Sequence, residues 1–112
     1  MNNSEIFKEK DFLKYFFSLS PSRRKQLITK LGRSQLNSLS EIFSNVLRGN
    51  LTRGNNKGLI KTLYPFKKSI RQLALKKTSL KEKRRILASK RGGSILGILL
   101  PVLSSLVSNL LG

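Results

Sequence analysis

The side chains best suited to chemistry in this sequence are its cations. Lys and Arg together number 23 among 112 residues, against 5 acids, so the formal net charge at pH 7 is +18. Because like charges oppose compaction, an excess this large favours a polyanionic partner. Nucleic acid is the commonest such partner, and an anionic membrane is the next.

The side chains that usually carry out catalysis are scarce. The sequence has no His and no Cys, which excludes thiol nucleophiles, imidazole bases and zinc sites of the N/S type. Its acids either crowd the first eleven residues or stand alone, so a paired-carboxylate site is not expected; they are Glu5, Glu9, Asp11, Glu41 and Glu82. We predict that the chain is not an enzyme and uses no metal or other cofactor.

Charge divides the sequence into three segments. Residues 1–52 carry 9 basic and 4 acidic side chains, residues 53–91 carry 14 basic side chains and one acid, and residues 92–112 carry no charge. The net charges of +5, +13 and 0 add up to the total of +18. We name these segments the head, the arm and the tail, and we predict a helical head, a basic helical arm and an apolar tail helix.

Three short amphipathic helices are expected to build the head. They begin at Ser4, at Ser20-Pro21 and at Ser34, because Ser caps helices and Pro suits the first helical position. Apolar side chains recur three or four residues apart and can pack together: Ile6, Phe12, Leu13, Phe16, Phe17, Leu27, Ile28, Leu31, Leu36, Leu39, Ile42, Phe43, Val46 and Leu47. The fold class predicted for the chain is all-α, a small bundle of short amphipathic helices.

The arm is expected to begin with a loop over residues 51–58 and a short helix over 59–63. Two longer helices should follow over 65–77 and 80–90, the second opened by a capping box at Ser79 and Glu82. We expect Gly92-Gly93 to end this second helix. Between the apolar stripes of these helices lie the cations that we predict to contact phosphates: Lys67, Lys68, Arg71, Lys76, Lys77, Lys81, Lys83, Arg84, Arg85, Lys90 and Arg91.

Binding through these cations should be electrostatic and independent of sequence, because Lys and Arg release counterions from phosphates. Two aromatic residues of the arm, Tyr64 and Phe66, can stack on bases, although we expect them in the core. The alternative for the arm is a solvated charged face on a structural helix. Residues 81–85 also fit a weak nuclear-localisation pattern.

The tail has two interpretations. It either packs on the head or on another copy of the chain, or it inserts into an anionic membrane. Pro101 should kink or restart its helix. The predicted membrane or oligomer contacts are apolar: Leu99, Leu100, Leu103, Leu106, Val107 and Leu110.

The order of these segments resembles the small basic proteins of Polinton (Maverick) elements and adintoviruses. The resemblance rests on Ser-Pro-Ser-Arg-Arg-Lys-Gln-Leu over residues 20–27 of the head, on residues 70–74 and 76–87 of the arm, on the pair Gly92-Gly93, and on the Leu-rich, Pro-containing apolar C-terminus. Its most specific part is the Ser-Leu-Lys-Glu-Lys-Arg run over residues 79–84. It covers most of the chain, from about residue 12 onward. Lys90 stands where adenovirus-type maturation proteases favour an aliphatic residue before a Gly-Gly pair, so cleavage after Gly93 is not expected.

The resemblance implies a DNA-condensing protein of a virion core, similar in kind to the basic core peptides of adenoviruses and located in the virion and the host nucleus. The expected partner is nucleic acid, DNA rather than RNA, and the N-terminal residues lack a secretory signal pattern. The alternatives are a membrane-active protein acting through the tail, a capsid-cementing protein that binds a capsid protein or a second copy, and a ribosomal-type RNA-binding protein.

Overall fold

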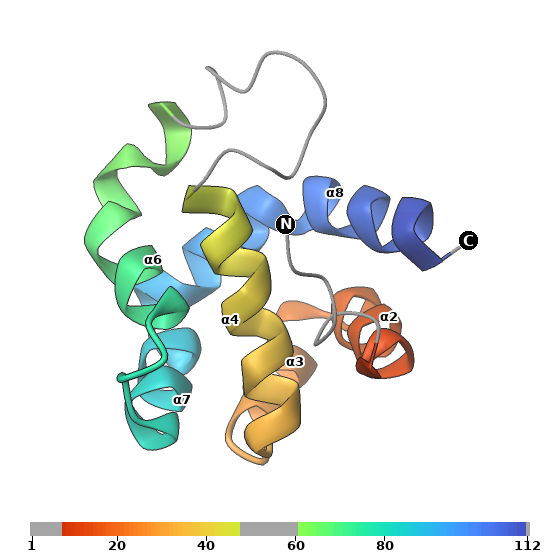
Figure 1. Ribbon diagram of the computed structural model, residues 1–112, viewed down its shortest axis with the longest axis horizontal. Helices are drawn as coiled ribbons and strands as arrows, with labels where there is room; N and C mark the ends of the chain where they lie inside the picture. The colour runs from red at the N-terminus through yellow and green to blue at the C-terminus, as the bar shows by residue number, and fades with distance from the viewer. Residues whose placement is uncertain (1–7, 48–60, 112) are drawn as a thin grey trace.

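The computed structural model describes residues 8–47 and 61–111, and for residues 46–47 and 102–111 it describes the backbone alone. The described chain is helical and contains no strand, which confirms the predicted all-α bundle. Its elements are α2 (Lys10–Ser18), α3 (Pro21–Ile28), α4 (Arg33–Leu47), the 3-10 helix η1 (Tyr64–Phe66), α6 (Lys67–Ala74), α7 (Leu80–Ala88) and α8 (Lys90–Leu111). Figure 1 shows how these short helices cross one another. The predicted start at Ser4 and the loop over 51–58 lie outside the described residues.

Serine hydroxyls set the beginnings of three helices. Ser20 Oγ accepts a hydrogen bond from the Arg23 N–H at 3.4 Å, and Pro21 occupies the first helical position, as the sequence predicts. Ser79 Oγ accepts from the Glu82 N–H at 3.1 Å and caps α7. The Glu82 carboxylate binds Arg85 rather than completing the capping box, so only one half of that prediction is confirmed.

The junction between α7 and α8 differs from the sequence-based prediction. Gly92-Gly93 does not end a helix, because α7 ends at Ala88 and both glycines lie in the first turn of α8. Ser89 has an extended backbone and its Oγ accepts from the Gly92 N–H at 3.1 Å, so it begins the new helix. A Cβ on Gly92 would lie 2.1 Å from the Ile86 carbonyl oxygen. The missing side chain therefore permits the first turn of α8 to lie against the end of α7.

A single hydrophobic core joins all three segments of the sequence. The head contributes the apolar faces of α2, α3 and α4, the arm contributes Ile70, Leu73, Ile86 and Leu87, and the tail contributes Ile95, Leu96 and Leu99. Helix α6 packs on α4, and α8 packs on both α2 and α7. The three segments thus differ in charge but share their packing. Ile6, Val46 and Leu47 lie outside the residues whose side chains the structure describes, and the other residues predicted for the core of the head are buried or pack against it.

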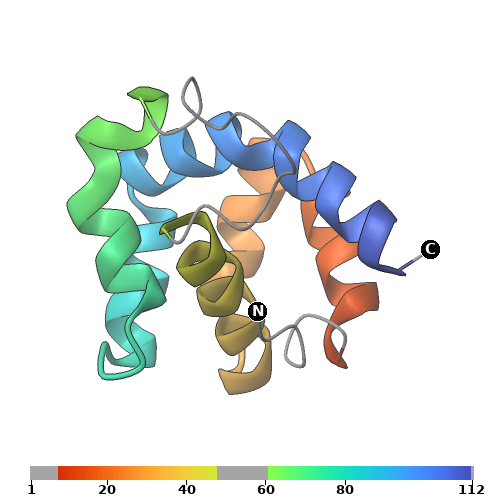
Figure 2. The same cartoon turned by 45° about the horizontal axis from the view of Figure 1, so that its top comes forward.

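Helix α8 begins beside α7 and then runs past α2 (Figure 2). It contains Pro101 and remains helical from Lys90 to Leu111. Figure 2 shows that the helix changes direction along its length, as expected where proline removes a backbone hydrogen bond. Within the described residues, no helix combines the length and hydropathy that a membrane crossing requires.

Candidate nucleic-acid interface

The basic arm forms one side of the molecule, where α6 and α7 lie next to each other (left in Figure 1). Nine of the eleven predicted phosphate contacts are exposed there or at the adjoining start of α8. We call these nine residues the cationic surface: Lys67, Lys68, Arg71, Lys76, Lys77, Lys81, Arg85, Lys90 and Arg91. Lys76 and Lys77 lie in the turn between α6 and α7, because α6 ends at Ala74 rather than at residue 77 as predicted.

One acid interrupts the cationic surface, and it is already paired. Arg85 Nε donates to Glu82 Oε2 at 2.9 Å, and Arg85 Nη2 contacts Glu82 Oε1. This pair holds the pKa of the Glu82 carboxyl below its usual range, chiefly through the hydrogen bond from Arg85. Glu82 therefore stays ionised near neutral pH and offsets one cation. Both side chains are substantially exposed, so the pair adds little to stability.

The structure corrects the assignment of Lys83. Its side chain is 3% exposed, and its Nζ donates to Ser40 Oγ on α4 at 2.7 Å. The position follows from the helical period, since Lys83 lies three residues before Ile86 and four before Leu87 on the inward face of α7. Burial lowers the pKa of this ammonium group. Lys83 therefore joins α7 to α4 and does not face a phosphate backbone.

Arg84 also turns toward the head. Its Nε donates to the carbonyl oxygen of Leu31 at 2.9 Å, at the end of the α3–α4 connection. The side chain is half-buried, so its first role in this fold is to satisfy a backbone acceptor. The spacing of three or four residues from Ile86 and Leu87 separates Lys83 and Arg84 from Lys81 and Arg85, but the prediction from basic composition alone did not use it.

The two aromatic residues of the arm take opposite positions. Phe66 packs against the core, as predicted. Tyr64 is 69% exposed, so its predicted place in the core is wrong. The tight turn of η1 around Pro65 directs the two side chains to different sides. Lys67 Nζ lies 5.8 Å from the centre of the Tyr64 ring, which places an exposed aromatic face at the edge of the cationic surface.

The predicted contact residues of the tail are only partly placed. Leu99 is fully buried in the core of its own chain, which corrects its assignment as a membrane or oligomer contact. Leu100 is half-buried against that core. The side chains of Leu103, Leu106, Val107 and Leu110 lie outside the described residues, so their assignment stays a prediction.

Two basic residues were not singled out from the sequence, one of which is exposed next to the cationic surface and the other buried. Lys61 is exposed, in the helical residues 61–63 that precede Tyr64, and extends the line of cations beyond the predicted set. Arg24 is 5% exposed in the head, although its helix reads as a strongly basic surface helix. Its spacing of four residues from Ile28 is the signal that indicates an inward position.

Comparison of the chain with protein-family models, with curated proteins and with solved structures finds no match.

Proposed function

We propose that the chain is a non-enzymatic, sequence-nonspecific nucleic-acid-binding protein that holds phosphate backbones on the cationic surface. One observation carries the proposal: nine exposed cations lie close together in the chain, on α6, α7, the turn between them and the start of α8, with a single acid, Glu82, which Arg85 already neutralises. Uncompensated exposed cations repel one another, and a phosphate backbone removes that repulsion while its counterions are released. We propose double-stranded DNA as the preferred nucleic acid.

Tyr64 adds a second kind of contact to this proposal. Its exposed ring beside Lys67 suits stacking on an unpaired base or packing against a sugar. Such contacts tolerate any sequence, because every base has a π-face. They are consistent with binding that depends on charge and shape rather than on base identity.

A DNA-condensing role in a virion core is the biological setting that fits this chemistry best. The support is the sequence resemblance to the small basic proteins of Polinton elements and adintoviruses, together with the size and net charge of the chain. Action on membranes and capsid cementing remain predictions that rest on the apolar residues of the tail.

A salt titration tests the proposed mechanism. Binding of the full chain to a random-sequence DNA duplex is measured by fluorescence anisotropy between about 50 and 200 mM salt. If six to ten phosphates are contacted, the affinity should fall about a thousandfold or more over this range. A second duplex of unrelated sequence should give the same affinity within about threefold.

Two results would overturn the proposal. Absence of binding at the lowest salt concentration would remove nucleic acid as the partner. Tight binding that is insensitive to salt, or that depends strongly on base sequence, would exclude the electrostatic mechanism. Competition between the duplex and a double-stranded RNA of equal length then decides which nucleic acid is preferred.

A further inference from the structure

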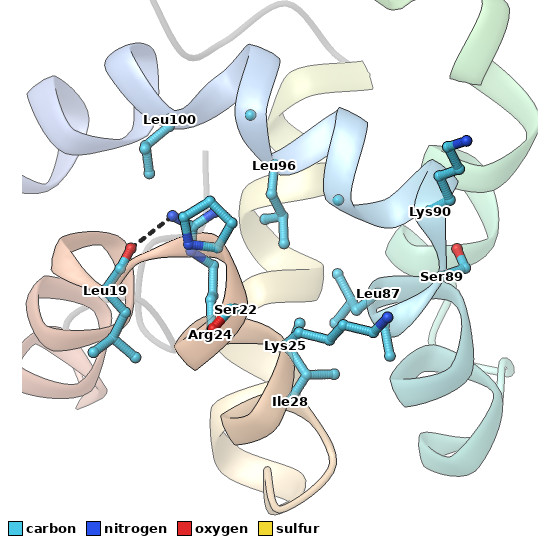
Figure 3. A pocket seen from close by; sticks show the side chains of 14 residues that line it. Leu19, Ser22, Arg24, Lys25, Ile28, Leu87, Ser89, Lys90, Leu96 and Leu100 are labelled. Carbon is cyan, nitrogen blue, oxygen red and sulfur yellow. Dashed lines mark hydrogen bonds between the residues drawn. The ribbon is translucent and has the colours of Figure 1, made fainter.

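A groove with apolar walls opens between α3, the end of α7 and the first half of α8, and its floor includes the core residues Ile28, Leu87 and Leu96 (Figure 3). Its volume is about 460 Å³, within the range of small-molecule sites. Leu19, Ile28, Leu87, Leu96 and Leu100 supply much of its apolar lining. Such a wall favours an apolar ligand body that water solvates poorly.

The charged side chains of the groove are all cations. Arg24, Lys25 and Lys90 line it, and no acidic residue does. Lys25 and Lys90 are exposed, so their ammonium groups are free to reach an anion at the mouth of the groove. Figure 3 shows both lysines on the side of the groove opposite the contact between Arg24 and Leu19.

Arg24 is the least expected of these cations, because it is 5% exposed and pairs with no carboxylate of the described residues. Its Nη2 donates to the Leu19 carbonyl oxygen at 2.8 Å, and its guanidinium carbon lies 6.0 Å from the centre of the Phe16 ring. Its Nε is buried without a hydrogen-bond partner. A buried cation with an unused donor is costly unless an anion offsets it.

Two glycines leave the α8 wall of the groove open. Gly93 and Gly97 line it, and a Cβ built on either residue meets no atom within 4 Å. Glycine in a helix interior costs about 1 kcal/mol relative to alanine. Among the described residues, no side chain fills the space beside Gly97.

From the apolar walls, the three cations and the open α8 wall, we infer that this groove binds a free, single-chain anionic amphiphile. The alkyl chain lies along Leu96 and Leu100, and the carboxylate or phosphate head interacts with the cations of the groove. This site differs from the cationic surface in its apolar lining and shares only Lys90 with it.

The experiment uses the full chain and sodium dodecanoate, titrated calorimetrically below the concentration at which dodecanoate aggregates. We expect one site per chain. Dodecanol, which has the same alkyl chain without the charge, should bind at least about tenfold more weakly, because charge-assisted contacts are lost.

Variants locate the site. Gly97→Leu should abolish binding by filling the groove, while Gly97→Ala should retain it within about threefold. The double variant Lys25→Gln, Lys90→Gln should weaken binding at least about tenfold. The double variant Lys14→Gln, Lys68→Gln removes the same charge from exposed positions outside the groove and should change affinity by less than about threefold.

Circular dichroism and DNA binding serve as folding controls for Gly97→Leu, which should leave both unchanged. The inference is overturned if dodecanol binds as tightly as dodecanoate, or if folded Gly97→Leu retains full dodecanoate affinity. It is also overturned if binding occurs only above the aggregation concentration or only to vesicles of anionic phospholipid, since the ligand would then be a lipid surface.

Discussion

Lys83 is an ammonium group buried between two helices without a carboxylate. Burial lowers the pKa of Lys83 in the folded chain below the ordinary value of 10.5. At a pH between the pKa of the folded chain and that of the unfolded chain, the unfolded chain holds a proton that the folded chain has released. Stability should therefore rise with pH through this window, and below it the cost of burying the charge is present in full. Its hydrogen bond to Ser40 offsets part of that cost.

Lys83→Met should keep the aliphatic packing of this side chain and remove the buried charge. We expect the free energy of unfolding at pH 7 to increase by about 1–2 kcal/mol, and the rise of stability toward pH 10.5 to become smaller than in the parent chain. Urea denaturation across this pH range measures both. A loss of stability at pH 7 would show that the Ser40 contact outweighs the burial of charge. The variant should bind DNA within about twofold of the parent.

Gly92 and Gly93 are neighbours with opposite tolerance for a side chain. A Cβ on Gly92 would meet only backbone atoms, at 2.1 Å from Ile86 O and 2.6 Å from Leu87 O, whereas a Cβ on Gly93 meets nothing within 4 Å. Gly92→Ala should lower stability by about 2 kcal/mol or more, since the backbones of α7 and α8 must separate. Gly93→Ala should be neutral or stabilising by up to about 1 kcal/mol. Thermal unfolding followed by circular dichroism compares the two, and equal losses would contradict the close approach of α7 and α8.

At the scale of the elements, the sequence predicts the helices well where apolar periodicity is strong. The buried faces of α2, α4 and α6 follow their three- and four-residue spacings, and Ser20 and Ser79 cap the helices they were expected to cap. The break at Ser89 was missed, because Gly92-Gly93 resembles a helix end when the contact with Ile86 is unknown. Burial of Lys83 and Arg24 was missed although their helical spacing indicates inward positions, because the groups that accept their hydrogen bonds, Ser40 Oγ and the Leu19 carbonyl, cannot be identified from the sequence.

Helix α8 contributes side chains to the core, and a substitution of Leu99 tests this contribution. Leu99→Ala removes a fully buried side chain and should lower the free energy of unfolding by about 2–5 kcal/mol. Leu100→Ala, at the half-buried neighbouring position, should cost less than half as much. Urea denaturation measures both values. If Leu99→Ala leaves stability unchanged and alters only self-association or vesicle binding, the tail does not contribute to the core.

At the scale of the whole molecule, segments of different charge are folded around one core. Helix α8 of the apolar tail packs on α2 and α7, while nine cations of α6, α7, the turn between them and the start of α8 remain exposed. The packing of α8 on α2 and α7 fixes where α8 begins, and therefore the positions of Lys90 and Arg91. If the proposed function holds, the affinity for nucleic acid should depend on where the cations lie as well as on total charge.

The most direct measurement is therefore the salt dependence of DNA binding for two variants of equal net charge. In the first, Lys76, Lys77 and Lys81 of the cationic surface are replaced by Gln; in the second, Lys10, Lys14 and Lys30, which are equally exposed in the head, are replaced by Gln. The slope of log affinity against log salt should become shallower by about 2–3 in the first variant, since each lost phosphate contact removes about 0.9. The second variant should retain the parent slope within about 1. Equal changes in both variants would mean that binding follows total charge alone, and would contradict an interface on α6, α7 and the start of α8.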